Sequence, residues 1–171
     1  MVNKRQRHLA PARPYLFLHC VDGANVTSVP TALVWGYIDI LTSELYYKEG
    51  DDRVVVLKGG AGLYEVMVSV CVEKSQGNAG HTILELYVNG TVLDCSEAHG
   101  YMGAPKEHSS AFLFYTVYLN RGDYIQTYIS VDNGSGNIET NTGRFHMRGL
   151  PMRGWNNDAG GKISYKGHVM R

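Results

Sequence analysis

The 171-residue chain is 44% hydrophobic and 19% charged, which suits one globular domain and excludes a disordered or collagen-like chain. No run of about 18 apolar residues occurs, so the sequence predicts no membrane-spanning helix. The apolar stretch Leu16-Phe17-Leu18 is too short for a secretory signal, so we expect no signal peptide and no membrane partner.

The zero net charge conceals three blocks of different sign. Residues 144–171 hold six Lys or Arg against one acid, whereas residues 14–143 hold six against fifteen. Residues 1–13 hold no acid and four basic residues, which are Lys4, Arg5, Arg7 and Arg13. Basic ends on an acidic body favour an anionic partner shared by the two ends, either nucleic acid or another shell protein. The alternative is that the terminal charges only keep solvated tails soluble.

The first half of the chain reads as an arm followed by short strands. We expect residues 1–13 to be extended, because Pro11 and Pro14 disfavour a helix. Apolar runs bounded by Gly, Asp and Pro then predict strands. These predicted strands cover residues 15–20, 31–40, 44–48 and 53–58.

The most regular alternation lies between Gly62 and Val131. Apolar side chains recur at every second residue over 63–72, which is the period of a half-buried strand. Asn89-Gly90 predicts a tight hairpin between strands at 82–88 and 91–95, because a type I′ turn needs two positive φ angles. The polar residues 96–109 are interpreted as a long loop.

The last strands complete an all-β fold. We expect strands at 110–119, 124–131 and 142–150, with a tight turn at 120–123 and a Gly/Asn-rich loop at 132–141. About nine strands without a helix predict an antiparallel jelly-roll β-sandwich. The predicted organisation is a basic arm (1–13), one jelly-roll domain (14–150) and a basic tail (151–171).

Five tyrosines of the predicted strands are more large aromatic side chains than one hydrophobic core readily buries. Large aromatic residues on both faces of a sheet indicate that a neighbouring copy covers the second face. We therefore predict a subunit interface that contains Tyr87, Tyr115, Tyr118, Tyr124 and Tyr128. The alternative is that some of these rings pack under loops.

The sequence gives little sign of catalysis or metal binding. The seven histidines form no His-x-x-x-His pair, and no catalytic motif is present. The acidic cluster at 49–52 suits calcium or, as the favoured interpretation, a solvated turn. Asp123 is expected to accept local turn hydrogen bonds. We predict no enzymatic activity, no metal and no cofactor.

The cysteines leave two interpretations open. Cys71 and Cys95 lie in or beside predicted strands and could pair. Without a secretory signal, buried free thiols are favoured.

Four segments resemble the tumour necrosis factor-like and complement globular-head superfamily. They are Gly-Leu-Tyr-Glu-Val at 62–66, Leu-Tyr-Val-Asn-Gly at 86–90, Val-Tyr-Leu-Asn-Arg-Gly-Asp-Tyr-Ile at 117–125 and Gly-Arg-Phe-His-Met-Arg-Gly at 143–149. The resemblance covers residues 31–150 and implies a ten-stranded jelly roll that packs as a homotrimer. Similar modules occur in secreted ligands and in virion proteins.

The basic arm moves the interpretation from a secreted ligand toward a virion structural protein. The leading hypothesis is a small capsid protein, or a capsid-decorating or fibre-head protein, that assembles through trimers and is located in the virion. One competing hypothesis is a trimeric module that binds a receptor or a glycan through its loops. The other is a jelly-roll enzyme or sugar-binding protein with a pocket in the sandwich.

Overall fold

The computed structural model describes residues 13–21, 23, 25–74, 77, 79–103, 108–132 and 138–151. Within these ranges the chain forms twelve strands and no helix, so the prediction of an all-β fold is confirmed. No helix in the described part could therefore cross a membrane. Most of the arm, including Lys4, Arg5 and Arg7, and most of the tail lie outside the described residues.

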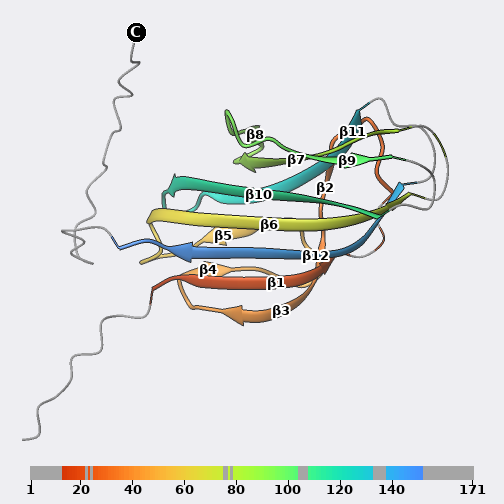
Figure 1. Cartoon of the computed structure of the whole chain (residues 1–171). Coiled ribbons are helices and arrows are strands. Elements are labelled where there is room, and N and C mark those ends of the chain that lie inside the picture. Colours follow the sequence, from red (N-terminus) through yellow and green to blue (C-terminus); the bar gives the residue numbers. More distant parts are fainter. Residues whose placement is uncertain are drawn as a thin grey trace, which may run out of the picture.

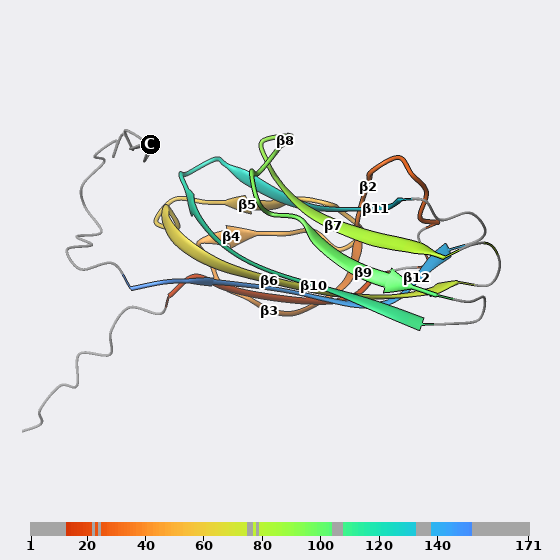
Figure 2. The same ribbon diagram turned by 45° about the horizontal axis from the view of Figure 1, so that its top comes forward.

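The strands form two antiparallel sheets that stack as layers (Figures 1 and 2). The first sheet has the order β10-β6-β12-β1-β3, with strands β1 (Tyr15–Val21), β3 (Trp35–Leu41), β6 (Gly62–Lys74), β10 (His108–Leu119) and β12 (Ile138–Gly149). The second has the order β4-β5-β11-β7-β8, with β2 paired to β11 and β9 paired to β7. Its strands are β2 (Thr31–Ala32), β4 (Leu45–Tyr46), β5 (Val54–Val56), β7 (Gly80–Val88), β8 (Thr91–Val92), β9 (Ala98–Met102) and β11 (Tyr124–Asp132).

The core lies between the two sheets and follows the alternation of the sequence. On β6 every second residue from Gly62 to Lys74 is buried, and the intervening residues face the other way. Leu84 and Leu86 of β7 and Ile125 of β11 are buried from the second sheet. Burying one such side chain stabilises the fold by about 1.5–3 kcal/mol. The period-two pattern thus places one apolar face of each sheet in the core.

Two buried tyrosines use their hydroxyl groups to fix loops. The Tyr64 hydroxyl donates to the carbonyl of Gly60. The Tyr47 hydroxyl donates to the Trp35 carbonyl at 2.7 Å and accepts from the Trp35 amide at 3.0 Å. Burial raises the pKa of Tyr47 to about 12 and also raises the pKa of Tyr64. Both groups therefore remain protonated donors at neutral pH.

The two tight turns predicted from the sequence are present and are tied to each other. Asn89 and Gly90 have φ angles of 53° and 78°, as a type I′ hairpin requires. Asp123 accepts from the backbone amide of Asn120 at 2.7 Å, which confirms the expected local bond. It also accepts from the side-chain amide of Asn89 at 2.8 Å. One carboxylate thus joins the β7–β8 hairpin to the turn at 120–123, which connects the two sheets and is not a hairpin, because β10 and β11 are not paired with each other.

The first and last strands of the domain are neighbours. β12 lies between β6 and β1, and Tyr15 is paired with Arg148. The Gly149 amide donates to the Pro14 carbonyl at 2.8 Å. The start of β1 and the end of β12 therefore lie side by side at one end of the sandwich (Figure 1).

The structure corrects three boundaries. The predicted long strand at 31–40 is two strands, β2 and β3, which belong to different sheets. The predicted loop at 96–109 contains β9, and the predicted loop at 132–141 ends in the first residues of β12. Cys71 and Cys95 are free thiols, and Cys95 is exposed rather than buried. The strand count is therefore higher than the nine that were expected.

Candidate functional site: the open face of the five-stranded sheet

The face of the first sheet that points away from the core carries a continuous set of large side chains. Paired residues on neighbouring strands project to the same side, so the register defines rows that cross the sheet. One row contains Phe112, Ser69, Arg144, His19 and Tyr37; the next contains Phe114, Met67, His146, Phe17 and Ile40; the third contains Thr116, Glu65, Arg148 and Tyr15. We call the surface formed by these three rows the open face.

The open face exposes more aromatic surface than a soluble sheet normally leaves in water. Phe112 and Phe114 on β10 are 60% and 53% exposed, and Tyr37 on β3 is 59% exposed. Tyr15 and Phe17 lie between them and are half-buried. Contiguous apolar surface of this kind marks an interaction site more often than an ordinary surface.

The charged groups on the open face are largely paired with one another. Arg148 donates to Glu65, and this hydrogen bond raises the pKa of Arg148. His19 Nδ1 lies 2.5 Å from Asp39 Oδ2. Arg144 is exposed between these pairs. The face thus carries its own counter-charges alongside its aromatic rings.

His146 lies at the centre of the open face. Its ring makes an edge contact with Tyr15 at 4.8 Å between centroids and lies 6.1 Å from the ring of Phe17. Its Nε2 atom is buried and has no hydrogen-bond partner among the described residues. Burial, followed by the nearby Arg148 charge, lowers the pKa of His146, while Glu65 acts in the opposite direction.

A hollow of about 690 Å³ opens on the part of the face formed by β10, β6, β12 and β1. It is lined by aromatic rings, four hydroxyl groups, a thiol and two cationic or ionisable nitrogen groups. The lining residues are Tyr15, Phe17, Met67, Ser69, Cys71, Ser110, Phe112, Thr142, Gly143, Arg144 and His146. A complementary surface could insert side chains into this hollow.

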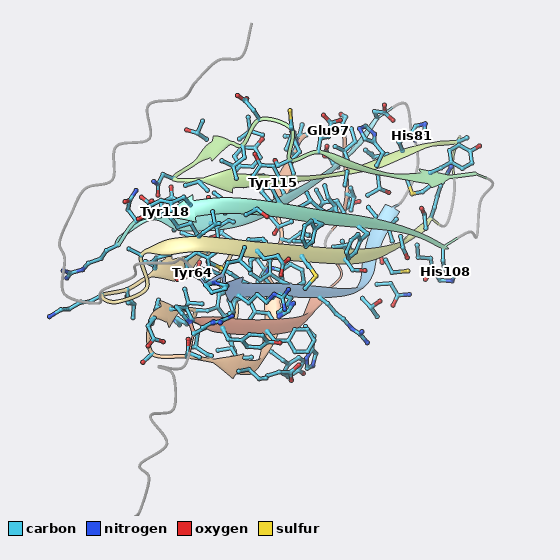
Figure 3. The ribbon with its side chains drawn as sticks, turned by 60° about the vertical axis from the view of Figure 1, so that its left-hand side comes forward. Tyr64, His81, Glu97, His108, Tyr115 and Tyr118 are labelled. Carbon is cyan, nitrogen blue, oxygen red and sulfur yellow. The ribbon has the colours of Figure 1, made fainter. Side chains whose placement is uncertain are left out.

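The five tyrosines predicted for the interface are not brought together. Tyr118 lies on the side of β10 that forms the open face, near one end of the strand, and His108 lies near the other end (Figure 3). Tyr115 has the opposite orientation: it packs against the core and its hydroxyl donates to the Asp94 carbonyl at 2.8 Å. The outward position expected for Tyr115 is therefore wrong.

The other three tyrosines lie on the outer face of the second sheet. The rings of Tyr87 and Tyr128 pack at 4.1 Å between centroids. The guanidinium of Arg53 lies 5.0 Å from the centre of the Tyr124 ring. All three are half-buried, so local partners already cover much of their surface.

Sequence reasoning missed the residues that make the open face. The alternation of β10 carried the signal, because Phe112 and Phe114 share a parity opposite to that of the buried Leu113. Phe17 and Tyr37 were less visible, since nothing in the sequence indicates that β1 and β3 extend the same sheet. The face is therefore a product of strand order.

The remaining candidate residues do not form a site. Arg13 is exposed at the entrance to β1. Asp52 accepts from the Gln126 side chain at 2.7 Å and pairs with Arg53, which explains part of the acidic cluster at 49–52. The described residues contain no group of three or more His, Cys, Asp or Glu that could hold a metal ion.

Comparisons with known proteins agree with the fold. No protein-family model matches the chain, and no curated protein matches it. The globular domain of the zebrafish complement 1qA protein matches with a TM-score of 0.54 and 8% identity, over 81% of this chain and 98% of that one. Murine APRIL matches with a TM-score of 0.47 and 16% identity, over 77% and 98%. The chain therefore has an antiparallel jelly-roll fold similar to that of the complement globular domain.

Proposed function

We propose that this chain is a recognition module that works as a homotrimer, and that its copies associate through the open face. The observation that carries this proposal is the set of three aromatic rows across the first sheet. The resemblance of the sequence to the superfamily agrees with this proposal, because that resemblance implies trimers. We propose a binding role and no catalytic one.

The open face is large enough for a specific interface. Five strands spaced about 4.8 Å apart give a width of about 24 Å, and the strand from Ser110 to Tyr118 adds a length of about 27 Å. The resulting area of roughly 650 Å² approaches the about 800 Å² that each partner buries in a standard interface. Leaving such a surface in water would favour aggregation.

A second copy of the chain fits this face better than a strongly charged partner. Within one protomer, Glu65 already pairs with Arg148, and Asp39 with His19. A face that supplies its own counter-charges needs none from the partner. Aromatic residues and Arg are also the types enriched at interface centres.

The recognition surface is proposed at the end of the sandwich away from the start of β1. Lys74 is paired with Ile138 there, and Gly80 with Met102, so three strand connections meet at this end. Tyr101 on β9 is 64% exposed beside it. Exposed aromatics beside loops are common contacts to sugars and proteins.

The self-association is tested with two substitutions on the open face. Phe112→Ser with Phe114→Ser removes exposed aromatic surface from β10 and should convert the trimer to a monomer. Multi-angle light scattering would measure the mass against the 19.0 kDa of one chain. The matched control is Tyr101→Ser, an equally exposed aromatic on the other sheet. A wild-type protein that stays monomeric at micromolar concentration would refute the homotrimer.

Recognition is tested by the binding of labelled trimer to cells before and after glycosidase treatment. Loss of binding after treatment indicates a glycan, and persistence indicates a protein receptor. Tyr101→Ala should weaken the binding, whereas Tyr46→Ala, a 49% exposed tyrosine on β4, should not. Absence of binding to untreated cells would contradict the recognition role and leave the trimer intact.

A second candidate is the virion structural protein that the charge distribution favours. The specific observation is that β1 begins beside the end of β12, so both basic segments are attached at one end of the domain. In a symmetric trimer these attachment points repeat three times. The basic segments would then contact a polyanion or another shell protein together, and avidity would offset the weak binding of one copy.

Electron microscopy of purified protein separates this candidate from the first. Uniform shells, or nucleic acid that copurifies and dissociates at high salt, support the virion role. Discrete trimers without larger particles or nucleic acid contradict it. Deletion of residues 1–13 should abolish copurification if Lys4, Arg5, Arg7 and Arg13 make the contacts.

A further inference from the structure

We propose that protonation of His146 separates the copies of this chain, so that assembly through the open face is reversed by mild acid. This inference rests on the proposed function, because it concerns the same interface. It assigns a regulatory role to one residue at the centre of that interface. The argument starts from the surroundings of the imidazole ring.

The ring of His146 is held between aromatic side chains. Tyr15 contacts it in an edge arrangement, and Phe17 of the same strand lies next to it. Met67 is its register partner on β6, and Phe114 lies one strand further on β10. A second copy packed on this face would remove the remaining water from around the ring. A charged imidazolium would then lie in an apolar environment, which costs free energy.

Charged neighbours oppose protonation on balance. On β12 itself, Arg144 and Arg148 lie two residues before and two residues after His146, on the same face. Glu65 on β6 favours the charged form, but it is bonded to Arg148. His19 on β1 is bonded to Asp39 of β3. The other ionisable groups on the facing sides of these strands are Tyr15, Tyr37, Cys71, Glu73, His108, Tyr118 and Glu139.

The Nε2 atom gives the second reason why protonation is unfavourable. It is buried and has no partner among the described residues, so a neutral ring that carries its proton on Nδ1 acquires an unpaired buried donor when Nε2 is protonated. A buried donor without an acceptor costs about 1–3 kcal/mol. The neutral ring fits this site, and the imidazolium does not.

The sign of the pH dependence follows from the further burial of His146 by a second copy. Burial already lowers the pKa of this histidine within one folded chain, and removal of the remaining water would lower the pKa further, so the assembled state binds fewer protons than the separated state. Acidification through the region below pH 6.5 therefore favours the separated state.

The test measures the trimer dissociation constant by sedimentation at pH 7.5 and pH 5.5. We expect at least about a tenfold rise at the lower pH, because three copies of His146 titrate together. His146→Gln should assemble at pH 7.5 and lose most of this rise. His99→Gln, on the second sheet and paired with Glu97, should keep the full rise.

The outcomes separate this inference from the proposed function. A wild-type chain that is monomeric at pH 7.5 refutes the interface itself. A trimer that is equally stable at both pH values leaves the interface intact and overturns the role of His146. If His146→Gln fails to fold, nuclear magnetic resonance titration of the wild-type histidines decides. The pKa of His146 must then be lower in concentrated than in dilute protein, and equal values overturn the proposal.

Discussion

Tyr64 fills the core and also holds a loop, whereas the alternation in the sequence indicates only the first role. Its ring belongs to the alternating apolar face of β6 and is fully buried. Its hydroxyl donates to Gly60, in the bend that precedes the strand. A phenol at the start of a strand can therefore fill the core and fix the entering loop, because its polar atom reaches past the apolar layer.

We predict that Tyr64→Phe lowers the free energy of unfolding by about 1–3 kcal/mol, because the carbonyl of Gly60 loses its buried donor. Urea denaturation monitored by fluorescence would measure the change. Tyr118→Phe, on the open face, should change the unfolding free energy by less than about 0.5 kcal/mol. Equal effects of the two substitutions would show that the Gly60 bond contributes nothing.

The parity of residues along β10 was sufficient to separate two tyrosines that the interface prediction grouped together. Tyr115 and Tyr118 are three residues apart, so in an unbroken strand they face opposite sides. The structure places Tyr115 toward the core and Tyr118 on the open face. The type of residue suggested an interface, but only its position within the strand determines which face it joins.

At the scale of elements, β9 is a strand that the pattern of residues in the sequence did not predict. Its residues Ala98–Met102 do not alternate between apolar and polar, and Gly100 occupies a buried position. This glycine is required by packing: a Cβ atom there would lie 2.9 Å from the carbonyl oxygen of Ser110 and 3.1 Å from the amide of Ala111. The backbone of β9 thus lies against that of β10, across the boundary between the sheets.

We expect Gly100→Ala to destabilise the fold by about 1–3 kcal/mol, since the new methyl group must displace backbone atoms of β10. Thermal unfolding followed by circular dichroism would record a lower Tm. Gly23→Ala is the matched control, because nothing lies within 4 Å of the Cβ atom that it adds. A Tm for Gly100→Ala as high as that of the control would mean that β9 and β10 can separate freely.

Local signals predicted most strands and both tight turns, but not the order of strands within the sheets. The turns at Asn89-Gly90 and at 120–123 are encoded by residues within a few positions of the turn. The pairing of β12 with β6 and β1 joins segments that are far apart in the sequence. The open face depends on that pairing, which is why its five strands were not recognised as one surface.

At the scale of the whole molecule, the paired ends of the fold define its limits. Pro14 and Gly149 are joined by a backbone hydrogen bond, and a Cβ atom on Gly149 would lie 3.0 Å from the Pro14 ring. Both residues are buried. This contact closes the described part of the fold, and the domain boundaries of 14 and 150 stay a prediction.

A chain reduced to residues 13–151 should fold cooperatively, with an unfolding free energy within about 0.5 kcal/mol of the full chain. The physical reason is that every core residue of the described structure lies inside these limits. Chemical denaturation of both chains would test this. A further truncation to 17–147 removes the Pro14–Gly149 contact and serves as the destabilised control. A non-cooperative transition for 13–151 would show that the terminal segments belong to the folded unit.

The central position of β12 has a consequence for the order of events during synthesis. β12 is synthesised after every other strand of the described residues, and it separates β6 from β1 in the finished sheet. Until residues 138–149 emerge, both of those strands present an unpaired edge, and β1 with β3 has no attachment to the rest of its sheet. During synthesis these edges therefore stay exposed to pairing with strands of other chains until residues 138–149 have been translated.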